Sequence, residues 1–197
     1  MQTRMLNAGP LHHRDGRLTE TGYAFTHLKT YDRSRVKAPW WRIKEWDYYA
    51  VCNDHHGIAF TIADNGYMGL ASVSLLDFNE KTHHTQSFLT PFPMGRLGLP
   101  ATSETGNSRI SGKQYELNFV VGPNKREIYG HVYDFREKGR QLLFDLELRN
   151  PLQDSMVIAT PFHKKPRHFY YNQKINCLPV QGRVILGDSD LLFSPAS

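Results

Sequence analysis

The sequence predicts an all-β protein, and three observations lead to this fold class. Apolar and polar residues alternate with a period of two in almost every segment after residue 40. The connections between these segments are short and rich in Asn, Asp, Gly and Pro, as tight hairpins require. No long stretch with a helical period interrupts them. Many antiparallel strands in sequence order indicate a meander that forms a barrel or a strongly bent sandwich.

The chain divides into a lead-in segment, residues 1–39, and an antiparallel β domain, residues 40–197. Within the lead-in segment only residues 19–33 are compatible with a helix, because Leu28 and Tyr31 would share one face of it. Gly22 and the β-branched residues of this segment weaken that interpretation. The first strands of the β domain are expected over residues 41–51, 57–64 and 68–78.

A long loop is expected next, over residues 91–107, "PFPMGRLGLPATSETGN". Three prolines and three glycines exclude regular structure there. A loop of this length is expected over a sheet edge or the mouth of a cavity, and it is the best candidate for a lid.

Three further strands are expected in the second half of the chain, in "YELNFVVG", "IYGHVYDF" and "QLLFDLELRN". The last alternates most clearly, with four apolar residues on one face, Leu142, Phe144, Leu146 and Leu148. The turn "GPNKRE" joins the first two strands, so the three form an antiparallel meander. Strands over 155–162 and within 168–188 follow, and no element after them obviously closes the sheet, which leaves open edges.

Composition and motifs exclude several classes of protein. The sequence has no apolar run of the length that a membrane-spanning helix needs and no signal-peptide pattern, so we expect a cytoplasmic protein without a membrane span. No phosphate-binding, zinc-protease or serine-nucleophile motif occurs. Cys52 and Cys177 lack metal-ligand spacing and are expected to be buried, reduced thiols.

Two weaker signals, histidine content and positive charge, are interpreted as structural. Six of the ten histidines form adjacent pairs, whose members point to opposite faces of a strand, so we expect surface or turn roles and neither a metal nor a cofactor. The net charge of +5 and the segment "HKKPRHFYY" resemble features of single-strand binders, but acidic residues are interspersed and no nucleic-acid-binding motif is present. Nucleic acid is therefore not an expected partner.

Two segments contain the candidate functional residues. In "KEWDYYAV", Trp46, Tyr48 and Ala50 share one strand face and Asp47, Tyr49 and Val51 the other. If the face of Asp47 is interior, its carboxyl must be paired or protonated. In "HFYYNQKINC", one strand face carries Tyr170, Asn172 and Lys174. That face is either exposed to solvent or part of a mainly apolar pocket with a few polar groups. A pairing of Asp47 with Lys174 is a hypothesis that follows from the second interpretation.

Four ordered blocks of the sequence resemble the bacterial domain-of-unknown-function family DUF2804. They are "RIKEWDYYAV", "FTIADNGYMGLASVSLLDF", "PFPMGRLGLP" and "FYYNQKINCLPVQGRVILGD", and the resemblance spans about residues 22–188. Members of that family are usually longer and continue into a Trp- and Gly-rich stretch that this sequence lacks, so the resemblance implies an N-terminal portion with an incomplete sheet. More distantly the family is similar to lipocalin-like carotenoid hydratases and tocopherol cyclases, which act on long apolar substrates.

The leading hypothesis is therefore a lipocalin-like module that binds a hydrophobic small molecule. Its predicted pocket residues are Trp46, Tyr49, Tyr67, Tyr170, Asn172 and Lys174. If the family catalyses hydration, cyclisation or isomerisation, Asp47 or Asp64 is the candidate proton donor. The alternatives are a non-catalytic scaffold whose open edge pairs with a second chain or with the missing C-terminal half, and an inactive fragment.

Overall fold

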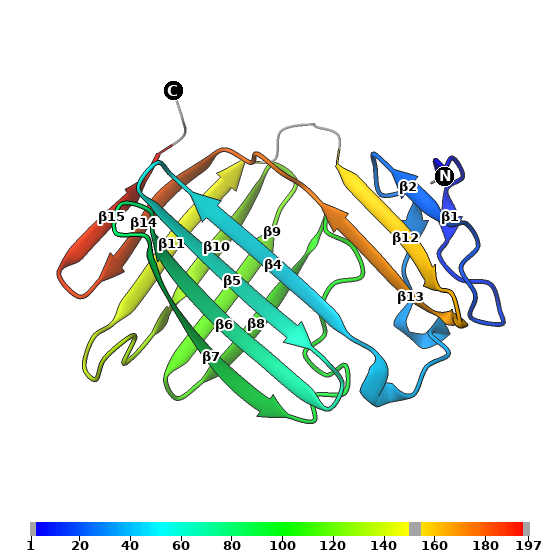
Figure 1. Ribbon diagram of the computed structural model, residues 1–197, viewed down its shortest axis with the longest axis horizontal. Coiled ribbons are helices and arrows are strands. Elements are labelled where there is room, and N and C mark those ends of the chain that lie inside the picture. The colour runs from blue at the N-terminus through cyan, green and yellow to red at the C-terminus, as the bar shows by residue number, and fades with distance from the viewer. Residues whose placement is uncertain (1–2, 150–154, 195–197) are drawn as a thin grey trace. The chain divides into compact units, whose positions relative to one another are not determined.

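The computed structural model describes residues 3–149 and 155–194, and strands make up nearly all of their regular structure. In these ranges the only helical elements are two short 3-10 turns, η1 (Arg33–Arg35) and η2 (Trp40–Arg42). The strands fall into two compact units, and Figure 1 labels most of the strands in chain order. The all-β prediction is thus confirmed for the described residues.

The first unit contains the described residues of Met1–Pro39, Ala101–Ser103 and Pro151–Leu178. Its strands are β1 (Gly9–Pro10), β2 (Gly22–Ala24), β3 (Lys29–Thr30), β12 (Met156–Phe162) and β13 (Lys165–Lys174). β12 pairs antiparallel with both β13 and β2, whereas the short β1 and β3 pair in parallel. A small apolar core joins these strands to the N-terminal segment: Met5, Leu11, Leu18, Ala24, Val157 and Ala159.

The second unit contains the described residues of Trp40–Pro100, Glu104–Asn150 and Pro179–Ser197. Four strands form one antiparallel sheet in chain order, β4 (Glu45–Cys52), β5 (His56–Asp64), β6 (Met68–Asp77) and β7 (Thr82–Pro91). Six strands form the other antiparallel sheet, in the order β15 (Ser189–Phe193), β14 (Val180–Leu186), β11 (Leu142–Arg149), β10 (Lys125–Val132), β9 (Tyr115–Val121) and β8 (Gly106–Gly112).

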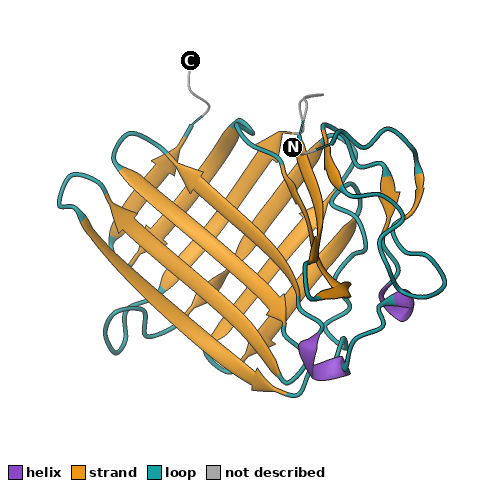
Figure 2. Cartoon of the chain, turned by 45° about the vertical axis from the view of Figure 1, so that its right-hand side comes forward, coloured by secondary structure: helices purple, strands orange, loops and turns teal. Residues whose placement is uncertain are grey.

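The two sheets of the second unit pack face to face, and their strands cross at a steep angle (Figures 1 and 2). Aromatic pairs connect them: the ring of Phe60 lies 4.6 Å from that of Phe144, and Phe88 stacks on Tyr115 at 4.1 Å. One strand of the first sheet therefore meets several strands of the second, as in orthogonal β packing. Neither sheet closes into a barrel within the described residues.

The sequence located most strands, and the expected meander is present as β9, β10 and β11. Six strands among the described residues were missed: the short β1, β2 and β3 of the lead-in segment, and β7, β8 and β15, whose sequences lack a clear apolar face. In β7, for example, the half-buried inward face includes His84 and Gln86, while Thr85 and Ser87 point outward. The expected hairpin connection "NPLQD", residues 150–154, lies outside the described residues.

The helix considered over residues 19–33 is wrong, because this segment forms β2, β3 and the start of η1. Gly22 explains the difference: its φ is +132°, and a Cβ there would overlap the carbonyl oxygen of Thr3. Close approach of two backbones thus requires glycine at this position. The parallel β1–β3 pair also departs from a wholly antiparallel arrangement.

Other expectations about single residues are corrected by their exposure. Cys52 and Cys177 are free but exposed, not buried. His12, expected at the surface or in a turn, is 1% exposed in the first unit, where its ring packs edge-on against Phe169. Burial lowers the pKa of His12, so the buried imidazole is neutral. The lead-in segment shares its core with β12 and β13, and the expected domain division at residue 39 stays a prediction.

Candidate site: a polar cluster inside the second unit

Strand β4 presents two chemically different faces, and its inner face carries the candidate site. Asp47, Tyr49 and Val51 point toward the six-stranded sheet, while Trp46 and Tyr48 point outward. This alternation follows from the pleat of an extended strand. Tyr49 packs its ring edge-on against Phe119 of β9 at 4.9 Å, so the strand crosses the opposite sheet at this point.

The carboxyl of Asp47 is the acidic member of the cluster. Its Oδ2 accepts a hydrogen bond from the hydroxyl of Ser108 on β8. Burial raises the pKa of Asp47 above its ordinary value of 3.8, although the bond from Ser108 and the charge of Arg126 oppose the rise. A carboxyl with a raised pKa retains its proton to higher pH than a solvated one, which is the property required of a general acid.

Arg126 of β10 is the basic member, and it is only 6% exposed. Its Nη1 donates a hydrogen bond to the phenolic oxygen of Tyr49 at 3.2 Å. Burial also raises the pKa of Tyr49, so its hydroxyl remains protonated and available as a donor. Asp47 and Tyr49 are half-buried and keep partial exposure to solvent.

Asp64, the second acid candidate, is fully buried and holds two backbone segments together. Its Oδ1 accepts a bond from the amide of Gly66 at 2.9 Å, and its Oδ2 from the amide of Gly95 at 2.7 Å. The first amide belongs to the β5–β6 turn and the second to the loop after β7. The predicted lid loop is irregular as expected over residues 92–105, but this carboxylate fixes its first part to the sheet.

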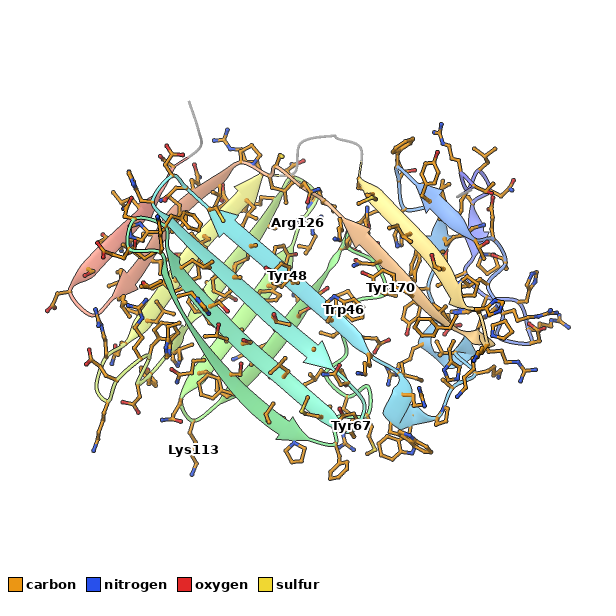
Figure 3. The ribbon with its side chains drawn as sticks, viewed as in Figure 1. Trp46, Tyr48, Tyr67, Lys113, Arg126 and Tyr170 are labelled. Carbon is orange, nitrogen blue, oxygen red and sulfur yellow. The ribbon has the colours of Figure 1, made fainter. Side chains whose placement is uncertain are left out.

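The predicted pocket residues belong to both units, and those of the second unit do not share one strand face. Trp46 lies on the outer face of β4 at 40% exposure, opposite to Tyr49, so these two side chains do not line one interior (Figure 3). Tyr67 lies in the β5–β6 turn and is 46% exposed. Among the residues predicted in the second unit, only Asp47 and Tyr49 therefore come together.

Tyr170, Asn172 and Lys174 lie on β13 in the first unit. As their spacing predicted, they alternate with Phe169, Tyr171 and Gln173, and the side-chain amide of Asn172 donates to the hydroxyl of Tyr170 at 2.6 Å. Tyr171 on the other face donates to the carbonyl of Lys29 at 3.0 Å. The hypothesis that Asp47 pairs with Lys174 joins residues of different units and stays a prediction.

Arg126 and Ser108 are the members of the cluster that sequence reasoning missed. The strand containing Arg126 was expected to begin at Ile128, but it begins at Lys125. Extending the alternation of Ile128 backwards by two residues places Arg126 on the apolar face, so the signal was present. Ser108 lies in the Gly- and Ser-rich strand β8, which offers no comparable signal.

The first unit contains a separate ion pair beside a shallow hollow of about 310 Å³. The Nζ of Lys29, whose side chain is 4% exposed, lies 2.8 Å from Oε2 of Glu20. The hollow is lined by these two residues together with Asn7, Ala8, Gly9, Pro10 and Thr19. Within residues 3–149 and 155–194 no group of three or more His, Cys, Asp or Glu is arranged to hold a metal ion.

Comparison with known proteins identifies a family but no characterised relative. The family model described as "Domain of unknown function (DUF2804)" matches residues 2–197. No curated protein and no solved structure matches the chain.

Proposed function

Since the chain belongs to the DUF2804 family, whose description assigns no activity, we propose a function from the polar cluster itself. The second unit binds a hydrophobic small molecule that carries a hydrogen-bond-accepting head group. The observation that supports this proposal is a buried guanidinium, a protonated phenol and a carboxyl with a raised pKa, placed together in an otherwise apolar interior. Such convergence of a few polar groups among apolar side chains is typical of ligand sites.

The chemistry of the cluster defines the head group. Arg126 supplies a positive charge, and the hydroxyl of Tyr49 supplies a neutral donor beside it. A ligand carboxylate or carbonyl oxygen would accept from both, and partial exposure of Asp47 and Tyr49 allows it to approach. The apolar part of the ligand would contact the aromatic side chains near the cluster, such as Phe119. The distant likeness of the family to lipocalin-like proteins favours the same ligand class, but fold alone does not establish function.

If the bound molecule is also transformed by acid catalysis, Asp47 is the proton donor that the geometry favours. Its pKa is raised and its side chain keeps partial exposure. Asp64 is less suited, because both of its carboxylate oxygens accept backbone hydrogen bonds in a fully buried position.

The test compares two neighbouring tyrosines of β4. Tyr49→Phe removes only the hydroxyl that meets Arg126 and leaves the ring against Phe119. Tyr48→Phe makes the same chemical change on the outer face. Binding of a dansyl-labelled fatty acid is measured by fluorescence titration, and ligands retained on purification are sought by native mass spectrometry. We expect Tyr49→Phe to weaken binding about tenfold, the effect of losing one hydrogen bond in a charged cluster.

Two results would contradict the proposal. One is the absence of any binding by the wild-type chain in both measurements. The other is an equal effect of Tyr48→Phe and Tyr49→Phe, which would locate the ligand away from the cluster.

A non-catalytic scaffold is the second candidate function. β4 and β7 form the edges of the four-stranded sheet, since each pairs with a single strand among the described residues. Edge strands with free backbone groups can pair with another chain. No helix of the described residues is long and apolar enough to cross a membrane, and a cytoplasmic location remains part of the proposal.

A further inference from the structure

The outer face of the four-stranded sheet has an unusual composition for a surface exposed to water. It consists of every second position over residues 46–52, 57–63, 70–76 and 83–89, as the strand registers show. None of these positions carries Asp, Glu, Lys or Arg. Apart from His83 at one end, the side chains are small, apolar or aromatic, and several are well exposed, with Tyr48 at 58% and Leu89 at 64%. We call this surface the uncharged face (Figure 3 labels Trp46 and Tyr48 on it).

The outer face of the six-stranded sheet provides an internal comparison. It carries charged residues that form ion pairs, two of them across strands, Arg109 with Glu116 at 2.8 Å and Lys125 with Glu147 at 2.9 Å, and one within β10, Lys125 with Glu127 at 2.8 Å. An exposed sheet face normally has this polar composition. The two outer faces of one unit therefore differ in the way that a solvated surface differs from a covered one.

The hydroxyl groups of the uncharged face bond to one another. Ser74 and Thr85 are joined across β6 and β7 at 2.8 Å, and the hydroxyl of Ser87 donates to that of Ser72 at 3.0 Å. Burying an unpaired hydroxyl costs about 1–3 kcal/mol, and these internal bonds reduce that cost. The face can thus lose its contact with water at little expense.

The sizes of the side chains in one row of this face would let two copies fit together. Tyr48, on the edge strand β4, is large, and its register partners across the sheet, Thr61, Ser72 and Ser87, are small. In a twofold arrangement of two such faces, the ring of Tyr48 from each copy lies over the short side chains of the other. A twofold interface requires the same patch on both copies, and a face without charges meets itself without repulsion.

We propose that the uncharged face is the interface of a homodimer, formed by sheet-on-sheet packing of two copies of this chain. Four strands about 4.8 Å apart and seven residues long give a face of about 450 Å². Two copies would then bury about 900 Å² in total, slightly below the roughly 1,000 Å² of a stable specific interface, as in a weak dimer. The dimer is accordingly expected to dissociate in the micromolar range.

The experiment measures sedimentation velocity of the full chain over a range of concentrations that spans the micromolar region. The mass of the wild-type chain should rise from 22.7 kDa toward twice that value. Tyr48→Arg introduces a charge on the edge strand of the uncharged face and should weaken dimerisation at least about tenfold, because buried aromatic residues dominate such interfaces. Tyr129→Arg is the matched control, since Tyr129 is 43% exposed on the outer face of the other sheet; it should leave the dimer unchanged.

A second substitution and a folding measurement keep the test decisive. Ala50→Glu places a charge on the same face, beside Ala59, and should also give a monomer. Circular dichroism and thermal unfolding verify that each variant is folded. A wild-type chain that stays at 22.7 kDa throughout would overturn the proposal. So would a dimer that persists equally in Tyr48→Arg and Ala50→Glu, because it would use another surface. Ligand binding at Tyr49 lies on the opposite face of β4, so its failure would leave this proposal intact.

Discussion

Replacing Asp64 by Asn separates a structural role of this carboxylate from a catalytic one. The substitution keeps the size of the side chain but replaces one acceptor oxygen with an NH₂ donor. In the native chain both oxygens accept backbone bonds, from Gly66 at 2.9 Å and from Gly95 at 2.7 Å. Whichever way the amide is turned, its NH₂ group must face one of these two N–H donors.

The expected loss of stability follows from this conflict. One hydrogen bond to a charged acceptor disappears, which is worth about 1.5–3 kcal/mol, and a backbone N–H in a poorly solvated position loses its partner. We therefore expect Asp64→Asn to lower the free energy of unfolding by about 3 kcal/mol. With a urea m-value of about 2 kcal/mol/M for a chain of this size, the midpoint should fall by about 1.5 M.

Urea unfolding followed by circular dichroism measures this change, with Asp54→Asn in the exposed β4–β5 turn as the matched control. The control should stay within about 0.5 kcal/mol of the wild-type value. Hydrogen exchange at the Gly95 amide should also accelerate in Asp64→Asn, because the loop after β7 loses its attachment. If Asp64→Asn matched the wild-type stability, the structural role assigned to these two bonds would be refuted.

Two other predictions concern the interior of the second unit. Because the pKa of Asp47 is raised in the folded state, protonated Asp47 contributes its full stability below pH 3.8, and this contribution is lost as the pH rises through the raised pKa. The stability of Asp47→Asn relative to the wild-type chain should therefore increase across that pH range. Urea titrations at several pH values measure this difference in unfolding free energy, and a difference that does not change with pH would contradict the prediction. Phe60→Ala should lower the free energy of unfolding, measured in urea, by about 3–5 kcal/mol, because Phe60 is fully buried against Phe119 and Phe144. A decrease below about 1 kcal/mol would mean that this core is loosely packed.

Local sequence patterns were sufficient for the strands with one apolar face. The alternation in residues 142–148 predicted β11, and its apolar residues are indeed buried. The same rule predicted that Asp47 and Tyr49 share a face of β4. It failed for β7 and β8, whose inward positions include polar or small side chains, and for residues 19–33, where pairing of β2 with β12 overrode any helical tendency.

The sequence by itself therefore determined which side chains share a face, because the pleat of a strand is a local property of the backbone. Only the tertiary structure decided what each face meets. Asp47, Tyr49, Ser108 and Arg126 come from three strands of two sheets, and the steep crossing of those sheets brings them together. Likewise, the registers of four strands place the uncharged residues on a single surface. Contacts between strands distant in the chain depend on packing of whole sheets, which no local period encodes.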